Sequence, residues 1–216
     1  MKTIVCFGDS NTWGCPPFAN IAQTPDRIPP EKRWTNIMGR HLAEDVWIVE
    51  EGLSGRTTVF DDQIEGLHKN GARTIIPVLE SHAPMDLLII MLGTNDFKEQ
   101  FSISSYNSAR GMLTLIQLVK GHYALSDTSP EILVVTPPKI GVAAEPAMWG
   151  DGHRKCIDHA YYLEQVASRT GCFHFDANKV VRAGIDGIHL DPEMHLLLGQ
   201  ALAREAASIL KMRAVR

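Results

Sequence analysis

The sequence predicts an α/β fold, a flavodoxin-like three-layer α/β/α sandwich around a five-stranded parallel sheet. Two observations support this prediction: short, apolar, β-branched runs recur along the chain, and stretches with helical spacing separate them. Strands that alternate with helices of this length are typical of parallel sheets whose right-handed crossovers place helices on both faces. Because 216 residues suit one such core, we expect residues 1–216 to form a single domain.

Each expected strand is a short run whose apolar character indicates burial on both faces. In chain order these runs are Thr3–Phe7, Val46–Glu50, Asp86–Met91, Ile132–Val135 and Phe173–Asp176. The expected helices lie between and after them, at Trp34–Ala43, Ile64–Leu79, Ser105–Lys120, Gly152–Ser168 and Pro192–Leu210. Asp191 and Pro192 mark the start of the last helix, as an N-cap and a first-turn proline.

Composition excludes several classes of partner. A net charge of −4 provides no basic surface for nucleic acid or anionic lipid. The apolar run Thr3–Phe7 is too short for a signal-peptide core or a membrane span, so we expect a cytoplasmic protein without a membrane partner. No disulfide is expected, because the four cysteines form no C-x-x-C pair and lie in core-like or loop sequence: Cys6, Cys15, Cys156 and Cys172.

Polar residues follow three of the expected strands, at the carboxyl edge of the sheet where ligands bind in such folds. Ser10 follows the first strand, the stretch 50–57 follows the second, and Gly93-Thr94-Asn95-Asp96 follows the third. Asp186-Gly187-Ile188-His189 lies in a loop just before the last helix and can reach the same edge. Singly each has a structural explanation as a turn or a cap; together they indicate a site.

These residues form a complete set for acyl transfer. Ser10 is the candidate nucleophile, and His189 is the base that a serine hydroxyl requires. Asp186 lies three residues before His189 and can fix its tautomer and stabilise the imidazolium. The backbone amides of Ser10 and Gly55 and the side-chain amide of Asn95 are the candidate oxyanion donors. Glycine at position 55 would allow the backbone to approach the substrate closely.

In this order, the blocks resemble the SGNH family, also called GDSL hydrolases, over nearly the whole chain. Ser10 matches the nucleophile of Gly-Asp-Ser, Gly55 and Asn95 match the oxyanion-hole residues, and Asp186 and His189 match Asp-x-x-His. Further blocks are similar to the bacterial arylesterase/acyltransferase branch: Thr12-Trp13-Gly14, Arg33-Trp34-Thr35, Glu50-Glu51-Gly52-Leu53-Ser54 and Ile90 to Asp96. The resemblance implies short acyl esters as substrates, acyl transfer to alcohols or peroxide, a homo-oligomer and no cofactor.

Residues beside the candidate site have more than one interpretation. Trp13, three residues after Ser10, is expected to line the substrate pocket. Thr94 and Ile188, which adjoin Asn95 and His189 in the chain, are expected there too. Asp9 and Asp96 flank the site and are interpreted as turn residues that accept hydrogen bonds from backbone amides and hold the loops.

Two long loops follow strands and have no predicted element of their own. They are residues 15–32 and residues 137–151, expected to form a rim around the site or a subunit contact. Phe18, Ile21 and Ile28 in the first loop would otherwise be exposed, which favours a homo-oligomer.

No metal site is expected. His153, Cys156 and His159 are spaced three apart, but six residues exceed one and a half helical turns and no fourth ligand is nearby. His195 is interpreted as a surface or capping residue of the last helix.

Two other functions remain as alternatives to a small-ester esterase. A carbohydrate O-acetyl esterase would use the same five site residues with a different pocket wall. A non-catalytic, flavodoxin-like binding module would cradle a phosphate with loop amides. In that case Gly8-Asp9-Ser10 would place an acid where the anion should lie, which disfavours the module.

Overall fold

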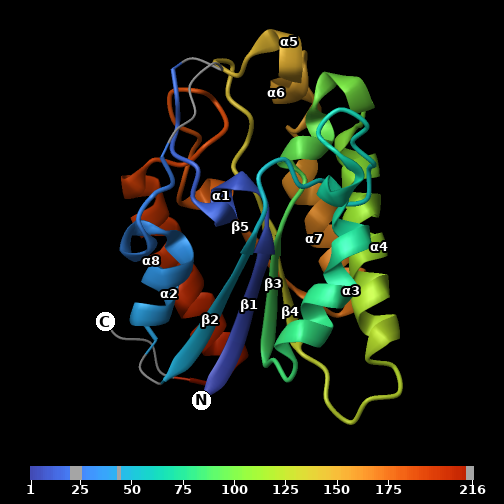
Figure 1. Ribbon diagram of the computed structural model, residues 1–216, viewed down its shortest axis with the longest axis vertical. Helices are drawn as coiled ribbons and strands as arrows, with labels where there is room; N and C mark the ends of the chain where they lie inside the picture. Colours follow the sequence, from blue (N-terminus) through green and yellow to red (C-terminus); the bar gives the residue numbers. More distant parts are fainter. Residues whose placement is uncertain (20–25, 43–44, 213–216) are drawn as a thin grey trace.

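The computed structural model, which describes residues 1–19, 26–42 and 45–212, contains one five-stranded sheet, and its helices lie on both sides (Figure 1). All strand pairs are parallel, and the order β2-β1-β3-β4-β5 is the flavodoxin-like order. The strands are β1 (Lys2–Gly8), β2 (Val46–Gly52), β3 (Leu87–Met91), β4 (Glu131–Thr136) and β5 (Phe173–Asp176). The predicted fold class is therefore confirmed, with each strand within two residues of its expected bounds.

Two groups of helices cover the two faces of the sheet. In Figure 1, α2 and α8 lie on one side, and α3, α4 and α7 lie on the other. The helices are α1 (Ser10–Trp13), α2 (Trp34–Arg40), α3 (Gly71–His82), α4 (Ser105–His122), α5 (Pro146–Trp149), α6 (Gly152–Lys155), α7 (His159–Thr170) and α8 (Pro192–Ile209). Short 3₁₀ turns are η1 (Pro30–Lys32), η2 (Leu67–Lys69), η3 (Thr94–Phe97), η4 (Glu99–Phe101) and η5 (Ala177–Lys179). Among the described residues, no helix has the length and apolar character needed to cross a bilayer.

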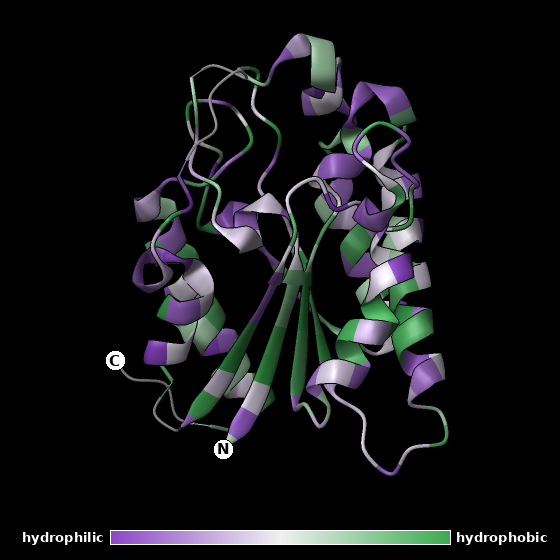
Figure 2. Ribbon diagram, in the orientation of Figure 1, coloured by the Kyte–Doolittle hydropathy of each residue, from purple (hydrophilic) through white to green (hydrophobic). Residues whose placement is uncertain are grey.

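Alternating side chains of the strands build two cores. Ile4 and Cys6 of β1 pack with α2 and α8, whereas Val5 and Phe7 pack with α3, α4 and α7. All four side chains are fully buried, and the strands are hydrophobic along most of their length in Figure 2. Burial on both faces explains why β1, β3 and β4 could be located from short apolar runs. The expectation of burial on both faces was wrong for the edge strands β2 and β5, whose residues are mostly half-buried or exposed.

One expected helix begins later than its pattern indicated. The spacing predicts a helix over Ile64–Leu79, but α3 starts only at Gly71. The Asn70 side chain accepts a 2.9 Å hydrogen bond from the amide of Ala72 and caps the helix there. Upstream, the Asp62 carboxylate accepts two backbone amides, which stabilises a turn in place of a helical start.

A second expected helix is divided. The pattern over Gly152–Ser168 predicts one helix, but α6 ends at Lys155 and α7 starts at His159. Between them the amide of His159 donates to the carbonyl of Cys156 over 3.1 Å, a tight turn that changes the chain direction. Periodicity does not reveal such a turn, because the turn depends on a backbone hydrogen bond and not on the spacing of apolar side chains.

The two long loops both lie at the carboxyl edge of the sheet. In the first, Ile28 is buried within this chain and so needs no second subunit to cover it, while Ile21 lies outside the described residues. In the second, α5 stands at the upper end of the molecule in Figure 1 and buries Trp149.

Candidate active site

Ser10 is the first residue of α1 and lies two residues after the end of β1. Asp9 is the N-cap of α1, and its Oδ1 accepts a 2.9 Å hydrogen bond from the amide of Asn11. Gly8 is required here, because a Cβ on it would lie 2.0 Å from Thr12 Oγ1. In the Gly-Asp-Ser sequence, Gly8 therefore allows Thr12 to approach the backbone closely, Asp9 caps α1, and Ser10 is the first residue of that helix. Asp9 holds its loop as expected.

Asp186, His189 and Ser10 form a continuous hydrogen-bonded chain. His189 Nδ1 lies 2.6 Å from Asp186 Oδ2, and His189 Nε2 lies 3.0 Å from Ser10 Oγ. Asp186 Oδ1 also accepts the backbone amides of Ile188 and His189, both at 2.9 Å, so the acid is fixed by its own loop. With the Nδ1 proton directed to Asp186, Nε2 is the nitrogen that faces the serine hydroxyl.

Asn11 connects α1, which begins with Ser10, to the loop that carries His189. Its Nδ2 donates to the carbonyl of Ile188 over 3.2 Å, and its Oδ1 accepts the amide of Leu190 over 2.9 Å. The buried Asn11 side chain thereby ties α1 to the loop that carries His189. Asn11 was not among the residues predicted from the sequence. Its signal was its position directly after the candidate nucleophile.

The candidate oxyanion donors come from the two loops that flank Ser10. Gly55 has φ +81°, and Asn95 lies in η3, directly after β3. Asn95 Nδ2 donates to the carbonyl of Arg56 over 3.1 Å, which leaves its second amide hydrogen available. Within the described part of the chain, the amides of Ser10 and Gly55 have no acceptor. These three candidate donors thus have hydrogens without a protein acceptor among the described residues, in segments that follow the adjacent strands β2, β1 and β3.

Burial and hydrogen bonding act in opposite directions on the acid and the base. Burial alone would raise the pKa of Asp186, but hydrogen bonds from the His189 ring and from two backbone amides lower it overall. Burial alone would lower the pKa of His189, but the hydrogen bonds and charges of Asp186 and Cys15 raise it to about 9. Burial also raises the pKa of Asp9 to about 6.

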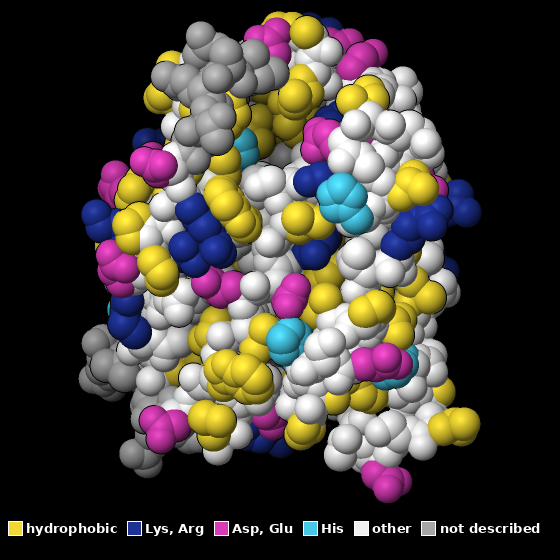
Figure 3. Space-filling model, in the orientation of Figure 1, with side chains coloured by type: hydrophobic (Ala, Val, Ile, Leu, Met, Phe, Trp, Pro, Cys, Tyr) yellow, Lys and Arg dark blue, Asp and Glu magenta, His cyan; other side chains and the backbone are white. Residues whose placement is uncertain are grey.

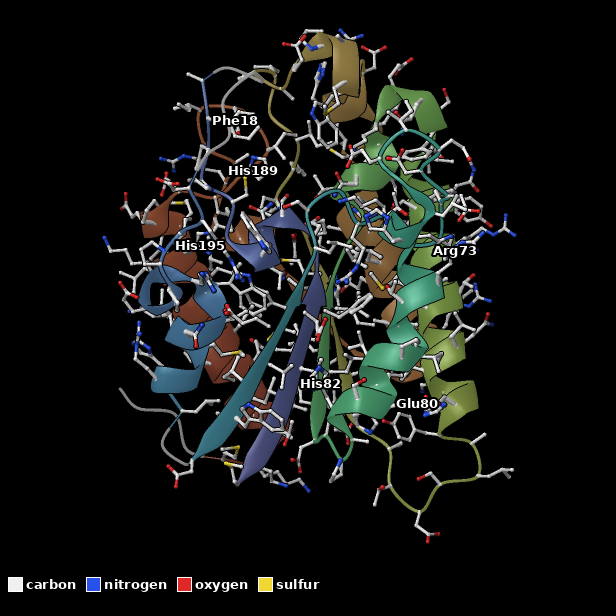
Figure 4. The ribbon with its side chains drawn as sticks, viewed as in Figure 1. Phe18, Arg73, Glu80, His82, His189 and His195 are labelled. Carbon is white, nitrogen blue, oxygen red and sulfur yellow. The ribbon has the colours of Figure 1, made fainter. Side chains whose placement is uncertain are left out.

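A small cavity of about 150 Å³ opens beside His189. It is lined by Phe18, Ala19, Ala143, Glu145, Met148, Trp149, Ile185, Asp186, Ile188 and His189. In Figure 3 the upper part of the molecule is hollowed, with hydrophobic side chains inside, and Figure 4 shows Phe18 beside His189. Both long loops therefore contribute to the rim of a mainly apolar cavity.

The three expected pocket residues are placed differently. Ile188 lines the cavity, whereas Trp13 and Thr94 do not. The Arg27 guanidinium lies 5.0 Å from the centre of the Trp13 ring, a cation–π contact outside the cavity. Thr94 is buried in η3, next to Asn95.

His195 corrects one sequence interpretation. It is fully buried, so a surface position was wrong, and in Figure 4 it lies below His189. Its Nδ1 accepts the amide of Trp34 over 3.2 Å, so it does act as a cap, but of α2 and not of its own helix. Burial lowers its pKa to about 4, which keeps the ring neutral.

Side chains able to hold a metal ion were sought throughout the residues that the structure describes. No group of three or more His, Cys, Asp or Glu residues with that capacity is present among them. Of the three residues weighed as ligands, His159 instead contacts Ser108 in the core. All four cysteines are free thiols.

Comparisons with known proteins show which families and structures the chain is similar to. Residues 6–197 match the model of the GDSL-like lipase/acylhydrolase family. The chain is similar to Est24, a carbohydrate acetylesterase from Sinorhizobium meliloti (37% identity, 97% of this chain and 100% of that one, TM-score 0.91). It is also similar to an aryl esterase from M. smegmatis (36% identity, 97% and 100% coverage, TM-score 0.90). No curated protein matches.

A more distant structure shares the fold alone: a lipase/acylhydrolase from Enterococcus faecalis, with 19% identity, full coverage of both chains and a TM-score of 0.68. Since the family model spans most of the chain and the nearer structures exceed a third in identity, the chain belongs to the GDSL-like lipase/acylhydrolase family, within the SGNH hydrolases. It is a carboxylic ester hydrolase.

Proposed function

We propose that this protein is a serine esterase that cleaves small, acetyl-like esters through Ser10, His189 and Asp186. Ser10 Oγ attacks the ester carbonyl while His189 Nε2 takes its proton, and Asp186 stabilises the resulting imidazolium. The amides of Ser10 and Gly55 and the Asn95 side chain stabilise the oxyanion. His189 then protonates the departing alcohol, and water resolves the acyl-enzyme by the same steps in reverse.

The observation that carries this proposal is the unbroken chain from Asp186 through His189 to Ser10, with contacts of 2.6 and 3.0 Å. A serine used only as a turn would need no histidine at hydrogen-bond distance, and that histidine would need no buried acid behind it. The same observation disfavours the non-catalytic binding module.

The cavity beside His189 supports an uncharged alkyl or aryl alcohol as the leaving group. His189, which would protonate this group, is one of its lining residues, and the lining is mainly apolar, with Phe18, Met148 and Ile188 among its members. A sugar hydroxyl array would leave polar groups without partners there. A carbohydrate O-acetyl esterase is the second candidate, favoured by the similarity to the Sinorhizobium meliloti acetylesterase.

We also propose acyl transfer to an alcohol or to peroxide, because of the apolar cavity beside His189. An apolar cavity next to the acyl-enzyme would bind an alcohol in competition with water. We also propose a cytoplasmic location, which four free thiols favour.

Labelling and substitution of Ser10 test the nucleophile. A fluorophosphonate should give a single adduct, located on Ser10 by peptide mass spectrometry. Ser10→Ala should form none and should lose on the order of several powers of ten in turnover of p-nitrophenyl acetate, with unchanged thermal unfolding. A panel of acetyl, butyryl and octanoyl esters beside acetylated sugars then separates the two candidate substrates. Near wild-type turnover by Ser10→Ala would refute the proposal.

A further inference from the structure

The carboxylate of Asp96 takes no part in the proposed chemistry, yet three hydrogen-bond donors contact it. Asp96 is fully buried and directly follows Asn95 in η3. Its Oδ1 accepts the backbone amide of Thr58 over 2.8 Å. Its Oδ2 accepts the Thr58 hydroxyl over 2.8 Å and the Ser108 hydroxyl over 2.6 Å. Three donors converge on one buried carboxylate.

These bonds join the two loops that carry the candidate oxyanion donors. Thr58 lies three residues after Gly55, and Asp96 lies one residue after Asn95. A second bond joins the same loops, since Asn95 Nδ2 donates to the Arg56 carbonyl over 3.1 Å. The position of Gly55 relative to Asn95 therefore depends on contacts made by side chains next to each of them.

Residues of the helices α4 and α7 contact Asp96 and its neighbours and support this connection between the two loops. The single hydroxyl proton of Ser108 (α4) is directed to Asp96, so His159 Nε2 (α7), 3.1 Å away, must donate to Ser108 Oγ. The His159 ring packs edge-on against Phe97, with centroids 5.1 Å apart, at the end of the same turn. Burial lowers the pKa of His159 to about 3, so the ring stays neutral.

Glycines allow the close packing of this network. Gly93 has φ +124°, and a Cβ on it would lie 2.3 Å from the His159 ring. A Cβ on Gly111, in the middle of α4, would lie 2.2 Å from Thr58 Oγ1. Glycine inside a helix costs about 1 kcal/mol relative to alanine, so Gly111 trades helix stability for the approach of Thr58. The turn that carries Asn95 has little room to move.

We infer that Asp96, held by Thr58 and Ser108, is a positioning residue that fixes the spacing between the Gly55 and Asn95 oxyanion donors. Such donors stabilise a transition state only when they lie about 2.7–3.1 Å from the developing charge. A misplacement of about 1 Å costs on the order of 10²-fold in rate. The inference rests on the proposed function, because it assumes that Asn95 acts on the oxyanion.

Ser108→Ala tests the inference with Ser105→Ala as its matched control. Ser105 lies on the same helix and is also buried, but its hydroxyl donates to the carbonyl of Lys155, away from the turn. Ser108→Ala should lower kcat for p-nitrophenyl acetate about tenfold with KM within about twofold, whereas Ser105→Ala should keep kcat. Rates are expressed per active site titrated with fluorophosphonate, so partial unfolding does not enter.

A double-mutant cycle with Asn95→Ala shows whether Ser108 acts through Asn95. Asn95→Ala alone should lower kcat roughly 10²–10³-fold, and adding Ser108→Ala should then lower kcat by less than about twofold. If the two effects multiply, or if Ser108→Ala behaves like Ser105→Ala, the positioning role is overturned. If Asn95→Ala keeps wild-type kcat, the proposed oxyanion role fails instead. Thr58→Val, which removes the other hydroxyl, replaces Ser108→Ala if that variant does not fold.

Discussion

The charge state of His189 sets the pH at which the enzyme works. The ring must be neutral to accept the Ser10 proton, so kcat/KM for a neutral ester should fall as pH falls through the pKa of His189 in the free enzyme. An unperturbed histidine would give a midpoint near 6.5. Contacts with Asp186 and Cys15 raise the pKa of His189 to about 9. We therefore expect an alkaline midpoint in a pH series corrected for uncatalysed hydrolysis, and a profile flat from about pH 5 to 9 would contradict it.

A variant of Cys15 separates the causes of that shift. Cys15 is buried beside His189, and its sulfur is one of the partners that stabilise the protonated ring. Cys15→Ala should move the midpoint of the pH profile downward while the maximal rate stays similar, because Asp186 still orients the ring. A midpoint that does not move would show that Asp186 alone sets the pKa of His189.

Asp186 has two tasks that one substitution removes together. It fixes the Nδ1 proton of His189 and supplies the counter-charge of the imidazolium. In Asp186→Asn the ring can turn or adopt the other tautomer, so kcat should fall by about 10⁴ while the circular dichroism spectrum and KM stay close to wild type. A variant that keeps most of its activity would mean that another acid orients His189.

Asp191 lies two residues after His189 and is the alternative acid, but the structure gives it a different role, in the start of a helix. Its carboxylate accepts the amide of Met194 over 3.0 Å and so caps α8. Asp191→Ala should lower the free energy of unfolding by about 0.5–2 kcal/mol, measured in urea, with kcat within about twofold. A collapse of kcat without loss of stability would contradict the capping role.

Elements with local signals could be predicted from the sequence, and those defined by contacts between elements could not. The strands β1, β3 and β4 were located because burial on both faces leaves a continuous apolar run such as Thr3–Phe7. The start of α3 was missed because the side chain of Asp62 captures backbone amides that a helix would use. The role of His195 was missed because the amide it caps, that of Trp34, is 161 residues away in the chain.

In the candidate site, too, local contacts could be predicted from the sequence and contacts between elements could not. Asp186 and His189 lie three residues apart, so their contact was foreseeable from spacing alone. Asn11, Ser108 and His159 reach their partners only through the packing of helices against the sheet edge. Asp96 was expected to hold its loop through backbone amides, and it does accept one, but the partner belongs to a different loop.

At the scale of the whole molecule, the rim of the cavity is more apolar than a solvent-exposed surface requires. Ile185 lines the cavity and is 71% exposed, and Val142, next to the lining residue Ala143, is 86% exposed. Both lie in loops at the carboxyl edge of the sheet, where the candidate nucleophile also lies. An apolar rim around a site favours contact with another copy of the chain, which would also narrow the entrance.

We therefore predict a homo-oligomer whose contact includes this rim. Light scattering at micromolar concentration should give a mass above the 23.9 kDa of one chain. Val142→Glu combined with Ile185→Glu should shift the protein toward monomer, because two buried, unpaired charges would oppose the contact. Leu125→Glu is the matched control, since Leu125 is fully exposed on the loop after α4, at the opposite end of the molecule from α5 in Figure 1. A wild-type monomer, or dissociation caused equally by Leu125→Glu, would place the contact elsewhere or exclude it.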